Sequence, residues 1–218
     1  MLTLAEENYL KAIYHLAEQS EQNVSTNAIA EELNTKAASV TDMIKRLSGK
    51  GILSYQKYRG VQVSETGKLA ALRVIRKHRL WETFLVAKLK FNWDEVHEVA
   101  EQLEHIQSPL LIKRLDELLG HPKFDPHGDP IPDENGEFKE KEKRPLFELE
   151  IDSAGLVVTV QDDSPNFLQY LDKIGIYIGA KIRVTDKVEF DGSMEIQIDS
   201  KKTIFISKQV SENIWVSD

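Results

Sequence analysis

The chain has 218 residues, a formal net charge of −8 at pH 7 and no cysteine. The lack of cysteine excludes disulfides, iron–sulfur clusters and thiolate zinc sites, and it fits a reducing cytoplasm. The first residues, MLTLAEENYLKAIYHL, have no basic region followed by a long apolar run, and no apolar run in the chain approaches transmembrane length. We therefore expect a cytoplasmic protein without a membrane segment.

The acidic charge is unevenly distributed. Residues 1–76 carry ten Lys or Arg and eight Asp or Glu, whereas the remainder carries 18 basic and 28 acidic residues. This asymmetry favours a slightly basic N-terminal module followed by acidic ones.

The first 65 residues predict a winged helix-turn-helix. Helical periodicity indicates helices at 4–19, at 25–34, where Ser25 or Thr26 is the expected N-cap, and at 36–51. Residues 52–67, ILSYQKYRGVQVSETG, alternate around Arg59-Gly60 as a β-hairpin does. Such a module places its third helix in the major groove of DNA, although winged helices also serve as protein-docking modules.

The predicted DNA contacts are small, hydroxyl-bearing or basic side chains on the third helix and the hairpin. They are Lys36, Ala38, Ser39, Thr41, Asp42, Lys45, Lys57, Tyr58 and Arg59, and Arg46 is also placed to reach phosphate. Asp42 is unfavourable beside phosphates unless it accepts from a cytosine amino group or points away.

Residues 66–142 predict a helical domain followed by an irregular segment. Helices are expected at 66–89, 93–106 and 108–120, and residues 121–145, rich in Pro, Gly and charge, predict a linker or an ordered loop. Residues 143–218 alternate as short strands, namely FELEI, GLVVTVQ, KIRVTDKV, MEIQID and KTIFIS, with one helix at SPNFLQYLDKIG. This last part predicts a small β-barrel-like domain, so the fold class is α+β and multidomain.

The helix that contains VHEVAEQLEHI predicts either a solvated charged face or a metal site. His97, Glu101, Glu104 and His105 stand at i, i+4, i+7 and i+8, and His78 and Glu82 form another i, i+4 pair on the preceding helix. If these helices pack antiparallel, six nitrogen and oxygen ligands converge, a set that suits Mn²⁺, Fe²⁺ or Zn²⁺.

An enzyme is the less favoured interpretation of these residues. The helical zinc-protease signature needs its second histidine at i+4, but here it comes eight residues after the first. The only spare carboxylate nearby, Glu98, points away from the ligand face, and the sequence has no nucleophile elbow, phosphate loop or dinucleotide fingerprint. We expect no enzymatic activity.

Over its whole length the chain resembles the metal-dependent regulators that include the diphtheria toxin repressor, the iron-dependent regulators and the manganese transport regulators. The resemblance rests on ENYLKAIYHL, YRGVQVSETG, RKHRLWETFL, VHEVAEQLEHI, PHGDPIP and FLQYLDKIGIYIGAKI. It implies a homodimer with a winged helix for a palindromic operator, a helical domain for dimerisation and metal, and a C-terminal SH3-like domain.

The resemblance also implies two sets of metal ligands. The primary set is Asn8, Glu101, Glu104 and His105, and the ancillary set is His78, Glu82 and His97. The loop FDPHGD would place Asp125 and His127 near Glu82. Asp163 and Asn166 match the positions where the C-terminal domain reaches across. Asn8 departs from the family, which carries Met or Asp there, and an amide oxygen brings no charge. Glu101 replaces a family cysteine, and hard oxygen in place of soft sulfur favours Mn²⁺ over Fe²⁺.

The resemblance therefore implies a metal-activated repressor that controls metal-ion uptake, with Mn²⁺ as the expected cofactor and Fe²⁺ as the alternative. The competing hypothesis is a metal-independent winged-helix regulator that binds another ligand through its C-terminal domain.

Overall fold

The computed structural model describes residues 2–19, 23–56, 60–139 and 142–217. It divides into two compact units, one made of Met1–His78, Glu101–Ile112 and Pro132–Glu137, the other of Arg79–Ala100, Lys113–Ile131 and Phe138–Asp218. Among the helices of the described ranges, none is long and apolar enough to cross a membrane.

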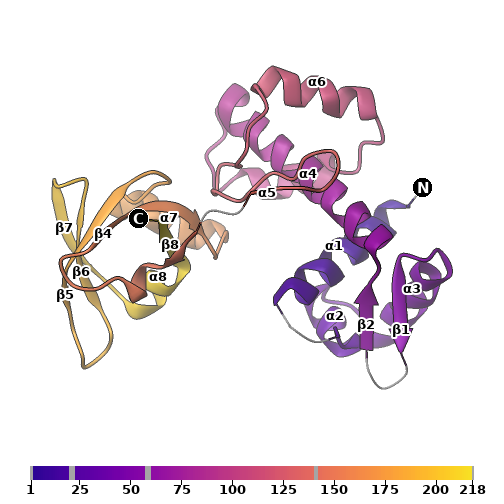
Figure 1. Cartoon of the computed structure of the whole chain (residues 1–218), viewed down its shortest axis with the longest axis horizontal. Helices are drawn as coiled ribbons and strands as arrows, with labels where there is room; N and C mark the ends of the chain where they lie inside the picture. The colour runs from indigo at the N-terminus through magenta and orange to yellow at the C-terminus, as the bar shows by residue number, and fades with distance from the viewer. Residues whose placement is uncertain (1, 20–22, 57–59, 140–141, 218) are drawn as a thin grey trace. The chain divides into compact units, whose positions relative to one another are not determined.

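The first unit contains the predicted winged helix (Figure 1). Its elements are three helices and a two-stranded antiparallel hairpin: α1 (Leu4–Gln19), α2 (Thr26–Glu32), α3 (Ala37–Gly49), β1 (Leu53–Gln56) and β2 (Gly60–Val63). Ser25 caps α2, its hydroxyl accepting from the Ala28 N–H at 3.1 Å, as the sequence predicts. The apolar faces of the helices meet in a core that includes Leu10, Ile13, Ile29, Val40 and Leu47.

Two glycines make the hairpin and its exit possible. Gly60 has a φ of +97°, and a Cβ there would lie 2.7 Å from the Val24 carbonyl oxygen, because β2 exchanges backbone hydrogen bonds with Val24. A Cβ at Gly67 would lie 2.2 Å from the Ile52 carbonyl oxygen, so the start of the next helix packs directly on the end of the wing.

Three helices follow the wing: α4 (Glu65–Leu89), α5 (Val96–Leu103) and α6 (Pro109–Leu119). Helix α5 is shorter than the predicted 93–106, so Glu104 and His105 lie in the turn after it and not on its face. The boundary between the two units falls inside α4, between His78 and Arg79, and inside α5, between Ala100 and Glu101.

The C-terminal part of the second unit is an antiparallel sheet in the order β3-β8-β4-β5-β6-β7, whose strands curve around one core (Figure 1). The strands and helices are β3 (Arg144–Pro145), η1 (Leu146–Glu148), β4 (Ala154–Val160), α7 (Pro165–Ile174), β5 (Lys181–Lys187), β6 (Met194–Ile198), β7 (Lys202–Ile206), α8 (Lys208–Asn213) and β8 (Ile214–Ser217). This arrangement confirms the predicted α+β multidomain class with a small β-domain at the C-terminus.

One predicted strand is wrong. FELEI was expected to alternate, but its start forms the 3₁₀ helix η1, because Leu146 and Leu149 are the fully buried residues. Their spacing of three matches the 3₁₀ period, whereas a strand would bury every second residue. Helix α8 and strand β8, which pairs between β3 and β4, were not predicted.

Candidate metal centres

The first cluster of charged side chains lies within the first unit and joins α1 to the end of α5. It consists of Glu7, Lys11, His78, Glu101, Glu104 and His105. His78 Nδ1 donates to Glu104 Oε2 at 2.7 Å, and the Lys11 ammonium lies 2.9 Å from each Glu104 oxygen while also contacting Glu101. Helix α1, from the DNA-binding fold, is therefore tied to α5 by ionic contacts.

Glu104 is the centre of the first cluster. Its side chain is fully buried. Burial opposes its ionisation, but the His78 hydrogen bond and the Lys11 charge outweigh burial and hold the pKa of Glu104 below its usual range. An ionised, buried carboxylate with cationic partners is a stable acceptor for either an ammonium group or a metal ion.

His105 contacts Glu7, a residue that the sequence prediction did not include. His105 Nδ1 donates to Glu7 Oε2 at 2.8 Å, and the other imidazole nitrogen lies 3.6 Å from Glu104 Oε1. The neighbouring Asn8 was the predicted ligand, and its buried Oδ1 accepts no hydrogen bond from the described residues. A buried oxygen acceptor without a donor fits a ligand role, and this role of Asn8 stays a prediction.

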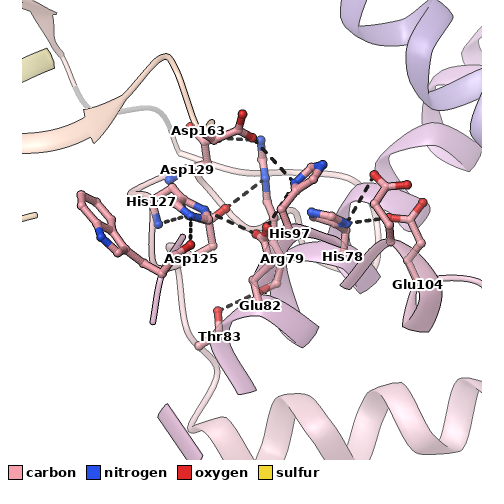
Figure 2. Close-up of polar contacts among 12 residues, drawn as sticks. His78, Arg79, Glu82, Thr83, His97, Glu104, Asp125, His127, Asp129 and Asp163 are labelled. Atoms are coloured by element: carbon pink, nitrogen blue, oxygen red, sulfur yellow. Dashed lines mark hydrogen bonds and ion pairs between the residues drawn. The ribbon is translucent and has the colours of Figure 1, made fainter. Parts of the chain in front are cut away.

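The second cluster lies within the second unit and consists of Glu82, His97, Asp125, His127 and Asp163 (Figure 2). Ligand atoms of Glu82, Asp125 and His127 all lie within 4.8 Å of one another, and all three residues are buried. His97 Nδ1 lies 3.6 Å from Glu82 Oε1 and 3.7 Å from Asp163 Oδ2, which brings a residue of the C-terminal β-domain to the cluster.

His127 is oriented by its backbone partner. Its Nε2 donates to the Trp93 carbonyl oxygen at 2.8 Å, which leaves Nδ1 facing Glu82 Oε2 at 3.8 Å. A carbonyl partner on one imidazole nitrogen is the usual device that presents the other nitrogen to a metal.

The loop holds Asp125 in one orientation. Asp125 Oδ1 accepts from the N–H groups of His127 and Asp129, both at 2.9 Å, and Oδ2 lies 3.5 Å from Arg79 Nε. Burial, together with the nearby Asp129 and Glu82 charges, raises the pKa of Asp125 to about 7. Crowded, buried carboxylates of this kind favour a bound cation, because a cation relieves both the repulsion and the desolvation.

The predicted ligands lie in these two clusters. Glu82 and His97 lie close to Asp125, His127 and Asp163, and His78 donates to Glu104 in the first cluster. Asn166, a predicted member of the ancillary set, is exposed. The sequence did not predict that Glu7, Lys11, Arg79 and Asp129 contact these clusters. All the oxygen and nitrogen donors of both clusters suit a hard or borderline divalent cation, so the residues present fit a metal ion.

The predicted DNA-facing residues of α3 and its N-cap position are exposed: Lys36, Ala38, Ser39, Thr41, Asp42, Lys45 and Arg46. Asp42 pairs with Lys45 at 3.4 Å, which offsets its charge, and the Thr41 hydroxyl donates to the Ala37 carbonyl within the helix. Lys57, Tyr58 and Arg59 of the wing lie outside the described residues.

Three family models match consecutive parts of the chain. Residues 1–61 match the N-terminal DNA binding domain of the iron dependent repressors, residues 64–133 match their metal binding and dimerisation domain, and residues 144–218 match the FeoA domain. A solved structure described as a manganese-dependent transcriptional repressor complex with manganese is 37% identical, with a TM-score of 0.86 over 97% of this chain and 98% of that one. The chain belongs to the diphtheria toxin repressor family.

Curated members of the diphtheria toxin repressor family agree. The iron-dependent repressor IdeR of Mycobacterium tuberculosis is 36% identical over 126 residues, a match that spans 58% of this chain and only about half, 54%, of the relative. The diphtheria toxin repressor of Corynebacterium diphtheriae is 28% identical over 207 residues, or 89% of each chain. The family relationship thus covers all three parts of the fold.

Proposed function

We propose that this chain is a metal-activated transcriptional repressor that binds operator DNA as a homodimer and controls the uptake of a metal ion. The observation that carries the proposal is the first cluster, where Glu7 of α1 and Glu104 and His105 of the α5 turn meet in one ionic group. A change in the charge held by this cluster acts directly on a helix of the winged-helix fold. Support comes also from the family models for DNA binding, metal binding and dimerisation.

The bound cation would supply positive charge to the buried carboxylates of both clusters. In the first cluster, Glu101, Glu104 and His105 would hold it, with Asn8 or Glu7 from α1. In the second cluster, Glu82, Asp125 and His127 would hold it, and His97 and Asp163 would complete the set. Because Asp163 belongs to the C-terminal β-domain, it would connect that domain to the helical one.

Mn²⁺ is the proposed physiological metal in preference to Fe²⁺. The donor atoms of both clusters are carboxylate oxygens and imidazole nitrogens, and the chain has no cysteine to favour a softer ion. Affinity alone would favour the later first-row metals, so selectivity for Mn²⁺ must come from geometry and metal supply.

The DNA-binding step follows from the exposed residues of α3. Two such helices in a homodimer would enter successive major grooves of a palindromic operator, at a spacing of about 34 Å, one turn of the duplex. Fixing the position of α1 through the first cluster would limit the positions available to α3. Metal binding would then raise DNA affinity, and DNA would raise metal affinity by the same factor.

A metal-independent regulator is the second candidate, and one observation favours it. Lys11 already forms ion pairs with both Glu101 and Glu104, so α1 is tied to α5 by one of the chain's own side chains. Under this hypothesis the operator affinity would not depend on any divalent ion.

Fluorescence anisotropy on an operator selected from random duplexes distinguishes the two candidates. We expect Mn²⁺ to tighten operator binding about tenfold or more relative to the same protein in chelator, since couplings of this kind span roughly 5- to 150-fold. The double variant Glu104→Ala, His105→Ala should lose this gain, whereas Glu98→Gln, which removes a charge from the neighbouring helix α5, should keep it. Equal affinities with and without Mn²⁺ would contradict metal activation.

A further inference from the structure

The Lys11 ammonium is held like a bound cation inside the first cluster. It contacts one oxygen of Glu101 and lies 2.9 Å from both oxygens of Glu104. An ammonium group has three N–H donors, and here three carboxylate oxygens are available to accept them. The side chain of Lys11 is only 14% exposed, and that of Glu104 is fully buried.

The position of Lys11 conflicts with a divalent ion at the same oxygens. Metal–oxygen distances are about 2.0–2.2 Å for small divalent ions. An ion on Glu101 and Glu104 would therefore lie within a few ångströms of Nζ, where two positive charges repel each other strongly in a buried site. The carboxylates can hold the ammonium or the metal, but not both.

We propose that Lys11 is an internal competitor for divalent cations at the first cluster. Its ammonium is the resident counter-charge of Glu101 and Glu104, and metal uptake requires its departure. The observed affinity is then the intrinsic affinity reduced by the small fraction of molecules in which Lys11 has moved away. Lys11 thereby sets the metal concentration at which the cluster fills, an inference that rests on the proposed function.

The second cluster lacks this arrangement. Among the described residues, Arg79 is the arginine in contact with it: its Nε lies 3.5 Å from one oxygen of Asp125, and its other nitrogens donate to the Pro130 carbonyl and Asp129. Arg79 therefore lies at the edge of its cluster, whereas Lys11 bridges the two central carboxylates of the first. A lysine competitor is therefore proposed for the first cluster alone.

Titration of Mn²⁺, followed by electron paramagnetic resonance and calorimetry, tests the proposal. All proteins carry His127→Ala, so that the second cluster does not contribute. We expect Lys11→Met to bind Mn²⁺ at least about tenfold more tightly than the parent and to be less stable in chelator, because it loses the resident counter-charge. A purely structural role would reduce stability without tightening metal binding.

Two variants serve as controls. Lys11→Arg retains the positive charge and should not gain affinity. Lys50→Met removes a lysine that pairs with the buried Glu6 of α1 at 2.7 Å, outside the ligand set, and should change Mn²⁺ affinity less than about twofold. A folded Lys11→Met protein with unchanged or weaker Mn²⁺ binding would overturn the proposal.

A measurement on the unaltered full-length chain needs no folded variant. Lysine acetylation by a limiting amount of reagent, read by mass spectrometry, should increase at Lys11 when Mn²⁺ is added and stay constant at Lys50. Constant or reduced acetylation of Lys11 on metal uptake would overturn the proposal. If Lys11→Met binds Mn²⁺ no more tightly and Mn²⁺ still activates DNA binding, only the proposal that Lys11 competes with the metal is refuted. If the parent protein binds DNA equally well without metal, only the proposed function is refuted.

Discussion

His127 shows how a single residue couples metal binding to protons. Burial by itself lowers the pKa of His127, yet the neighbouring Glu82 and Asp125 carboxylates outweigh it and raise the pKa to about 9. The imidazolium therefore acts as the counter-charge of the second cluster at neutral pH. This raised pKa stabilises the metal-free fold fully below about pH 6.5, and the stabilisation is lost as the pH rises through about 9.

Metal uptake at the second cluster should release this proton. At about pH 8, where Asp125 with its pKa near 7 is mostly ionised, we expect roughly one proton per Mn²⁺ from His127, because Nδ1 must be deprotonated to bind metal. Calorimetry in two buffers of different ionisation enthalpy measures that number. The control Lys11→Arg, which is altered only in the first cluster, should release the same number of protons. A binding enthalpy that does not depend on the buffer would contradict the release of a proton by His127.

The proximity of Asp125 and His127 to Glu82 could be expected from the sequence, because the two residues stand two apart in a loop, FDPHGD, that resembles the family. The partners that α1 contributes to the first cluster could not be predicted. Glu7, Asn8 and Lys11 occupy one turn of α1, and which of them faces His105 or Glu104 depends on the rotation of that helix, set by the packing of Leu10 and Ile13. Sequence spacing does not determine such a rotation.

At the scale of elements, the ligand-bearing loop depends on its contact with the β-domain. The His127 carbonyl accepts from the Val160 N–H at 3.3 Å, and the Thr159 hydroxyl donates to Asp129 at 3.2 Å. Gly128 allows this approach: it has a φ of +87°, and a Cβ there would lie 1.8 Å from the Val158 carbonyl oxygen. The loop and strand β4 are thus in direct backbone contact.

Gly128→Ala should therefore separate the loop from β4. We expect a loss of about 3 kcal/mol or more in the free energy of unfolding, from backbone strain plus the clash, together with weaker Mn²⁺ uptake at the second cluster. Urea unfolding in chelator measures the first effect. Gly179→Ala is the matched control, since φ is +96° but the position is open, and it should cost about 1 kcal/mol. Equal costs for the two variants would show that the contact with β4 is unimportant.

The helices and strands could be predicted from the sequence where the spacing of the apolar residues clearly followed a helical or a strand period. Helices α1, α4 and α6 and strands β4 to β7 follow their apolar patterns closely. Strand β8 was missed because its apolar stretch is short, with only Ile214 and Val216 fully buried, although it lies inside the sheet. Helix α5 was predicted too long, because the charged residues Glu104 and His105 continue the helical spacing beyond Leu103.

For the whole molecule, DNA binding must overcome a net charge of −8. Repulsion between the acidic parts and phosphate makes each exposed lysine on α3 important for affinity. We expect Lys36→Ala to weaken operator binding about equally for all sequences and to lower the salt dependence by about one unit of slope. Anisotropy at several salt concentrations measures this, with Lys201→Ala in the β-domain as the control. A change in sequence preference without a change in slope would place Lys36 on a base edge instead.

The central claim is that side chains of two clusters hold divalent cations in this chain, and Mn²⁺ titration calorimetry of the full-length protein tests it most directly. We predict two ions per subunit, of which Glu104→Gln removes one and Glu82→Gln removes the other, while Glu98→Gln keeps both. Absence of Mn²⁺ uptake by the parent protein, or uptake that neither ligand variant alters, would contradict the claim.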